Sequence, residues 1–307
     1  MIRRLLAVAH VALLEAVRSK LLVAIGLVHA AGTAYAALLA ALSLGHGARV
    51  VGDVSLASFS IVGLALVIVH AGTSVDLDIR RKAVLTVLTR AINRGEWIVG
   101  KYLGILAALA VYGGGAGTLS LITAGLVEGS TSRVVLAACV IVPVPAALAL
   151  RRSRRAAPFA YLMPLVALAA TAVASRDPGA AVFLRGASLA LFEAALVAAV
   201  ALLFATFSGP IPTAIFTVGV VLVGRSADAL AKLPTRNFPE GVVLAAGALA
   251  RCVPNLHVFV PPRPVLAGLD PAVAPRWLLA HAALYATTWC VVLLAGAILI
   301  IDRRDLA

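Results

Sequence analysis

Long uncharged apolar stretches are the feature that most constrains the fold of this chain. Windows of roughly twenty apolar residues are long enough to cross a hydrocarbon core about 30 Å thick. A backbone in lipid must satisfy its own hydrogen bonds, so such windows form helices. The sequence therefore predicts an all-α, polytopic membrane protein with about eight transmembrane helices. They are expected at 21–44, 54–75, 98–127, 133–150, 157–174, 187–207, 210–231 and 277–301.

Composition excludes a soluble domain. Hydrophobic residues make up 62% of the 307 residues and charged residues only 13%, whereas soluble domains have about 45–50% and about 25%. The net charge of +13 does not indicate nucleic-acid binding, because the basic residues lie at the ends of apolar windows, where they orient membrane helices. We expect no nucleic-acid partner. The three cysteines are isolated and predict neither a disulfide framework nor a metal site.

The distribution of basic residues predicts which side of the membrane each loop occupies. Sixteen of the 26 Lys and Arg residues fall on one side, including the cluster at 151–155. Loops rich in Lys and Arg stay in the cytoplasm, so both termini are expected there. Only 4 of the basic residues are Lys and Ala is abundant, which suggests a GC-rich prokaryotic genome. The expected location is the prokaryotic plasma (inner) membrane.

The first twenty residues predict an interfacial helix rather than a signal peptide. Apolar residues recur at helical spacing over 1–20, which suits a helix lying on the membrane surface. Glu15, Arg18 and Lys20 interrupt the uncharged stretch that a signal peptide needs, and no small-residue cleavage site follows.

The rest of the chain reads as a single transmembrane domain over 1–307. Residues 133–174 are expected to form a hairpin added to a core of six spans. The proline-rich segment 232–276 is the one sizeable extracytoplasmic piece and is too short for a separate soluble domain.

A charged amphipathic segment at 76–97, between the second and third spans, is the main candidate site. It is expected in the cytoplasm, where such a helix docks in a groove of a soluble partner by its apolar stripe. Its charged residues then pair at the rim of the groove. The residues expected to make this contact are Asp78, Arg81, Val84, Leu85, Leu88, Arg90, Arg94 and Glu96.

Residues 95–101, GEWIVGK, match the first seven positions of a phosphate-binding GxxxxGK loop. Tyr102 stands where that loop has Ser or Thr, and no strand precedes it. We therefore expect no nucleotide site, no cofactor and no enzymatic activity in this chain.

The segment 76–104 resembles the cytoplasmic loop of ABC-2 type transporter permeases, the membrane subunits of ABC exporters. Asp78, Leu85 and Leu88 correspond to the acidic and leucine-rich part, followed by Ala91-Ile92-Asn93-Arg94 and by Gly100-Lys101. Ala91 replaces the proline of the family pattern, and Lys82-Ala83 replaces its usual Gly/Arg-Thr. Within that family, the chain most resembles the branch of permeases involved in the maturation of multi-copper enzymes.

Three later stretches are also similar to that family. Residues 191–233 look like its paired late helices, and Val253-Pro254-Asn255-Leu256 with Phe259 resembles its extracytoplasmic Pro-Asn-Leu element. The terminal Ile301-Asp302-Arg303-Arg304-Asp305 resembles its closing Arg-Arg-Asp/Glu. The resemblance covers most of the chain apart from about 130–180.

This resemblance implies a permease subunit that forms a translocation pathway and is driven by a separate ATPase subunit, which binds the ATP. It also implies a homodimer or a heterodimer with a similar permease. Two alternatives remain open at this stage. One is a membrane scaffold or regulatory subunit that moves no cargo, and the other is an ion-driven secondary transporter, which would need charged midplane residues on broken helices.

Ionisable residues inside apolar spans are costly and mark possible sites. His29 and His70 fall in the cytoplasmic halves of the first two spans, where they are expected to be able to face each other. Glu193 lies in the outer half of the sixth span. Hydrogen bonding between helices is the simpler role for all three.

Overall fold

The computed structural model describes residues 2–43, 45–80, 93–128, 178–233, 238–270 and 274–303. Every regular element in these ranges is a helix. The α-helices are α1 (Ile2–Arg18), α2 (Leu21–Ala41), α3 (Gly47–Arg80), α5 (Arg94–Glu128), α9 (Pro178–Ala205), α10 (Pro210–Arg225), α11 (Ala227–Ala231), α12 (Glu240–Cys252), α13 (Arg263–Ala267) and α14 (Pro275–Arg303), and η2 (Leu256–Phe259) is a 3₁₀ helix. The predicted hairpin 133–174, with its two spans, lies outside the described residues.

Five of these helices are long and apolar enough to cross a membrane: Leu21–Ala41, Gly47–Asp78, Arg94–Val127, Gly179–Ala205 and Pro275–Arg303. The architecture is that of a helical, multi-pass membrane protein. Each of the five corresponds to a predicted span, and four of them extend several residues beyond the predicted apolar windows because helix formation continues into their charged ends.

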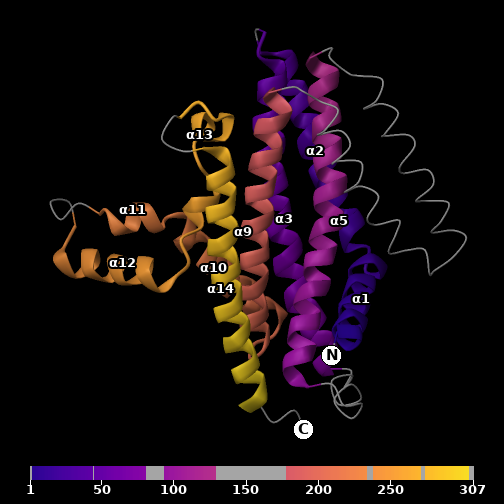
Figure 1. Cartoon of the computed structure of the whole chain (residues 1–307), viewed down its shortest axis with the longest axis vertical. Helices are drawn as coiled ribbons and strands as arrows, with labels where there is room; N and C mark the ends of the chain where they lie inside the picture. The colour runs from indigo at the N-terminus through magenta and orange to yellow at the C-terminus, as the bar shows by residue number, and fades with distance from the viewer. Residues whose placement is uncertain are drawn as a thin grey trace, which may run out of the picture.

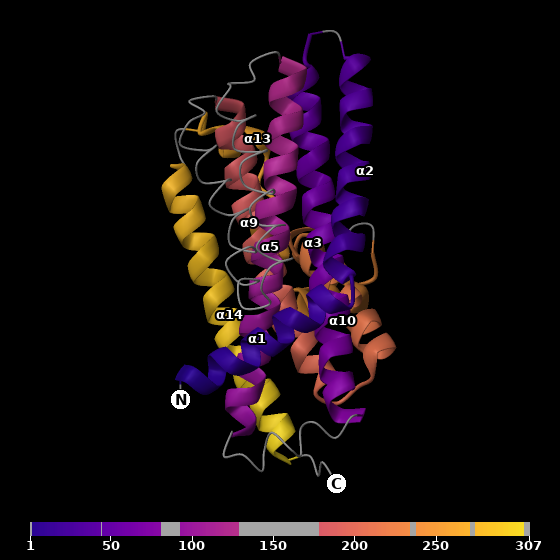
Figure 2. The same cartoon turned by 90° about the vertical axis from the view of Figure 1, so that its right-hand side faces the viewer.

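The long helices form one bundle, and both chain termini lie at the same end of it (Figure 1). We call this end the base; it contains the end of α3 at Arg80, the start of α5 at Arg94 and the end of α14 at Arg303. α1 crosses α5 obliquely near the base (Figure 2). α9 is the most buried of the candidate spans, and α2 and α14 are the least buried.

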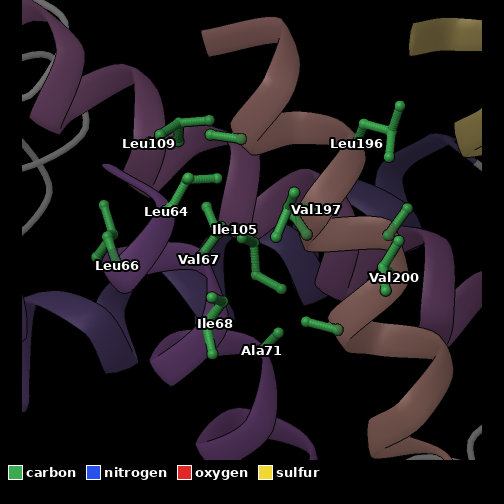
Figure 3. Close-up of a cluster of buried hydrophobic side chains, with 14 of the residues drawn as sticks. Leu64, Leu66, Val67, Ile68, Ala71, Ile105, Leu109, Leu196, Val197 and Val200 are labelled. Carbon is green, nitrogen blue, oxygen red and sulfur yellow. The ribbon is translucent and has the colours of Figure 1, made fainter. Parts of the chain in front are cut away.

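The core lies where α3, α5 and α9 meet. Figure 3 shows Leu64 and Val67 of α3, Ile105 of α5, and Val197 and Val200 of α9 pointing toward one another. All five side chains are buried. In lipid such contacts add dispersion attraction rather than a hydrophobic driving force between helices, so the polar contacts described below have a large share in fixing the arrangement.

The predicted single span 210–231 is instead two helices. α10 has 16 residues and ends at Arg225, and the chain turns at Ser226 before α11 begins. At 1.5 Å per residue α10 is about 24 Å long, which is short for a hydrocarbon core of about 30 Å. Gly224 sits so close to Pro254 that an added Cβ would lie 2.7 Å from the Pro254 carbonyl oxygen. The chain thus leaves the bundle where α10 meets the Pro254 segment.

α3 and α5 are longer than a membrane requires. They have 34 and 35 residues, or about 50 Å each at 1.5 Å per residue, whereas about 20 residues cross the hydrocarbon. Part of the excess lies at the base, where both helices continue past α1 (Figure 2). These two projecting ends carry the two ends of the segment between α3 and α5, whose residues 81–92 lie outside the described part of the chain.

Two glycines of α5 allow α1 to approach closely. A Cβ added at Gly100 would lie 2.6 Å from Val8 Cβ, and one added at Gly104 would lie 2.4 Å from Ala12 Cβ and 2.7 Å from the Ala9 carbonyl oxygen. The spacing of four residues puts both glycines on one face of α5. This is the small-residue spacing that lets membrane helices pack backbone to backbone.

Replacing Gly104 with Leu is expected to separate α1 from α5, because no space exists for the new side chain. Overpacking of this kind costs about 1–3 kcal/mol, so thermal unfolding of the purified chain in detergent should occur at a lower temperature. The matched control is Gly115→Leu on the same helix, since nothing lies within 4 Å of a Cβ at Gly115. Equal unfolding temperatures for the two variants would contradict the close packing of α1.

Candidate functional site

A buried ion cluster joins α1, α3 and α5 near the base. Lys101 of α5 is 1% exposed. Its Nζ lies 2.9 Å from Asp78 Oδ2 of α3 and 3.0 Å from Glu15 Oε2 of α1. Nζ also donates to the Ser74 carbonyl oxygen of α3 at 3.4 Å. One ammonium group thus contacts two other helices that are distant from it in the sequence.

The cluster uses all the hydrogen-bonding capacity of the lysine. An ammonium group has three N–H donors, and Glu15, Asp78 and the Ser74 carbonyl accept from them. Asp78 also accepts from Trp97 Nε1 at 3.2 Å. A buried ion costs several kcal/mol of desolvation, which is offset only when its partners are well placed. The cluster therefore favours one relative position of the three helices.

A polar stripe on α3 runs beside this cluster. His70, Ser74 and Asp78 are spaced four residues apart and lie on one face of the helix. His70 lies against the backbone of α1 at Ala12. His70 Nε2 and Ser74 Oγ are buried and have no hydrogen-bond partner among the described residues. Buried polar atoms without partners are rare in native structures, and two of them lie next to Lys101 here.

The start of α5 is fixed to the end of α14. Arg94 Nη1 donates to the Ile301 carbonyl oxygen at 2.7 Å and to the Asp302 carbonyl oxygen at 3.0 Å. The last carbonyl groups of a helix lack partners within it, and a cation is favoured at this end of the helix dipole. Glu96 Oε2 accepts from the Asn93 backbone N–H at 3.3 Å, which is the reach-back half of a capping box.

The predicted contact residues of the segment 76–97 are only partly described. Asp78, Arg94 and Glu96 all bond within the chain, so they anchor the two ends of the segment. The remaining predicted contact residues lie outside the described residues: Arg81, Val84, Leu85, Leu88 and Arg90.

A second buried ion pair joins α9 to α10. Arg225 Nε donates to Glu193 Oε1 at 2.8 Å, and Arg225 Nη2 donates to Glu193 Oε2 at 2.9 Å. Nη2 also donates to Ser60 Oγ of α3 at 2.8 Å. The Glu193 side chain is 1% exposed and that of Arg225 is 33% exposed. A two-pronged arginine–carboxylate pair has a fixed geometry, so it holds the end of α10 against α9 and α3.

His29 is the centre of a third polar group. Its Nε2 lies 3.1 Å from the Ala116 carbonyl oxygen and 3.0 Å from Ser120 Oγ of α5, and its Nδ1 lies 3.3 Å from Ser58 Oγ of α3. Because a carbonyl oxygen can only accept, Nε2 is the donor to Ala116. His29 thus links α2, α3 and α5 by hydrogen bonds.

The prediction that His29 could face His70 is wrong. His29 contacts α3 at Ser58, and His70 lies twelve residues further along that helix, or about 18 Å at 1.5 Å per residue. His70 faces α1 instead.

Sequence reasoning missed the partners rather than the charged residues in the spans. Glu193 was a predicted site, but Arg225 and Ser60 were not. Glu15 and Lys101 are each a lone charge at the edge of an apolar run. Their position at the edges of apolar runs and their opposite charges were the only features of the sequence that indicated a pair.

The segment around Asn255 forms a packed junction. Asn255 Nδ2 donates to Asp228 Oδ1 at 2.7 Å, and the Asn255 backbone N–H donates to Tyr285 Oη of α14 at 2.7 Å. A separate contact joins Arg263 of α13 to Asp53 of α3. Partial burial, and then the neighbouring Arg49, lower the pKa of Arg263. The Asn255 contacts lie beside the middle of the bundle, where α11 meets α14, whereas Arg263 and Asp53 join α13 to α3 near the end away from the base (Figure 1).

No protein-family model matches the chain, and no curated protein is significantly similar to it. The geometry of the chain itself therefore carries the argument about function.

Replacing Lys101 with Met is expected to destabilise the chain by about 3 kcal/mol, because it leaves two partly buried carboxylates without their cation. Denaturant unfolding of the purified chain in detergent measures the loss. Adding Glu15→Gln and Asp78→Asn to the same variant should recover most of it. Lys232→Met is the control, since Lys232 is exposed; an equal effect of the two lysine substitutions would refute the cluster.

Replacing Glu193 with Gln is expected to destabilise the chain by about 2 kcal/mol, because Arg225 keeps its charge without a counter-ion. Combining it with Arg225→Met should give less than the sum of the two single losses, and the double-mutant cycle measures the coupling. Glu240→Gln on the exposed start of α12 serves as control. Strict additivity at the 193/225 pair would show that the two side chains do not interact.

Proposed function

We propose that this chain is the permease subunit of an ABC exporter. The observation that carries the proposal is the way the segment between α3 and α5 is held. Its start is tied through Asp78 to Lys101 and Glu15, and its far end is tied through Arg94 to the last carbonyls of α14. A charged amphipathic segment fixed in this way to several helices suits the transfer of a push from a soluble partner.

The coupling follows from these contacts. A separate ATPase subunit binds and hydrolyses ATP, and its closure pushes on residues 79–92. The apolar stripe of that segment, with Val84, Leu85 and Leu88, docks in a groove of the ATPase. Arg81 and Arg90 pair at the rim. Because Asp78 and Lys101 bond each other, the push reaches α3, α5 and α1 together and tilts them as one unit.

Lys101 has a structural role in this proposal rather than a phosphate-binding one. Residues 95–101 lie within α5, where Gly100 makes room for α1 and Lys101 holds the ion cluster. The permease performs no covalent chemistry, and it needs no cofactor of its own.

The remaining features of the proposal concern topology and assembly. The five long helices, the shorter α10 and the two spans predicted in the hairpin 133–174 place both termini in the cytoplasm of a prokaryotic cell. The base of the bundle then faces the cytoplasm. Two permease chains, identical or similar, assemble with two ATPase subunits and enclose the translocation pathway in the plasma membrane.

Replacing Leu88 with Asp is expected to abolish the ATP hydrolysis that the permease stimulates, because a charge in the apolar stripe blocks docking. The measurement is the ATPase rate of the complex reconstituted in vesicles, with membrane insertion checked by protease protection. Leu269→Asp is the matched control, since Leu269 is 77% exposed and lies after α13, away from the base. Full stimulation by the inserted Leu88→Asp variant would reject the coupling role.

A further inference from the structure

The outer face of α1, the side turned away from α5, combines exposed aliphatic and basic side chains. Leu6 is 59% exposed and Val11 is 52% exposed. Arg3 and Arg18 are also exposed. The single acidic residue of α1, Glu15, bonds to Lys101 on the other side. The outer face is therefore cationic and aliphatic, without an acidic residue to balance its charge.

The inner face of α1 packs on α5 without using the exposed residues of the outer face. α1 packs on α5 through Val8, Ala9, Ala12, Leu13 and Ala16, which are all buried. An ordinary amphipathic helix with this apolar inner face would have only polar residues on its outer face. Leu6 and Val11 break the pattern, because they expose large aliphatic groups between the arginines.

The position of α1 in the bundle indicates what covers this face. α1 runs crosswise near the base, and α3 and α5 continue beyond it (Figure 2). The ion cluster of Lys101, Asp78 and Glu15 lies at the level of α1. α1 thus lies where the apolar part of the bundle ends, which in a membrane-spanning protein is the level of the lipid headgroups. Basic and aliphatic residues on one helix face are typical of helices that lie in this interface.

We propose that the outer face of α1 binds the headgroups of anionic phospholipids. Leu6 and Val11 insert between acyl chains, and Arg3 and Arg18 pair with lipid phosphates, which suit the two-pronged geometry of guanidinium groups. Because Glu15 connects α1 to Lys101 and Asp78, bound lipid also fixes the position of the ion cluster. The inference stands apart from the transport function, since it concerns a lipid contact of the chain alone.

The test is the affinity of the purified full-length chain for phosphatidylglycerol in detergent, measured by native mass spectrometry, with phosphatidylcholine for comparison. Each basic residue near an anionic surface is worth about fivefold in affinity, so Arg3→Gln with Arg18→Gln should weaken phosphatidylglycerol binding about 25-fold. Phosphatidylcholine binding should change little. The Arg3→Lys, Arg18→Lys variant keeps both charges and should remain within about fivefold of the unaltered chain.

The matched control replaces Arg49 and Arg276 with Gln, because both are exposed and lie at the starts of α3 and α14, away from the base. This variant should bind phosphatidylglycerol like the unaltered chain. An equal loss in the control pair would overturn the proposal by showing that general charge governs binding. Unchanged phosphatidylglycerol affinity in the α1 variant would overturn it too, and if that variant also lost a co-purifying protein the face would belong to a protein partner.

Discussion

Moving an unpaired ammonium group from water into a protein interior costs several kcal/mol. At the base of this bundle, Lys101 bonds an acid from α1, an acid from α3 and a backbone carbonyl. The three helices must therefore meet with Glu15, Asp78 and Lys101 at one point. This requirement determines how α1 crosses α5, and Gly100 and Gly104 provide the space for the crossing. Two arginines fix helix ends by the same principle. Arg225 at the end of α10 bonds Glu193 of α9, and Arg94 at the start of α5 bonds the last carbonyls of α14.

The ion cluster also determines what the segment between α3 and α5 is able to do. Asp78 lies two residues before the last residue of α3, and Lys101 lies in the second turn of α5. A displacement of the segment therefore acts on a rigid joint and not on two independent helix ends. The proposed coupling to an ATPase and the proposed lipid contact of α1 both act through this joint, one from the soluble side and one from the headgroups of the bilayer.

Five of the predicted spans are confirmed as long apolar helices, because length and hydropathy are enough to identify such segments, whereas the two spans of the hairpin 133–174 stay predictions. The sequence also predicted a helix over the first twenty residues and identified Glu193 as an unusual charge. It did not predict which helices are neighbours, because apolar windows of similar composition carry little information about which helices pack against each other. Arg225 was therefore missed as the partner of Glu193, and the two histidines were wrongly expected to be able to face each other. The break after Arg225 lies inside the predicted span 210–231 and was also missed. The family resemblance and the docking of residues 81–92 remain predictions.

The most direct test of the central claim is the distance between α1 and α3 at the base, measured by pulsed electron paramagnetic resonance on the chain in lipid nanodiscs. Spin labels at Val11 and Leu77 are suitable, since both side chains are exposed. If the ion cluster locks the helices together, the unaltered chain should give one narrow distance distribution, and Lys101→Met should broaden it or add a second distance. Identical distributions in the two chains would contradict the account.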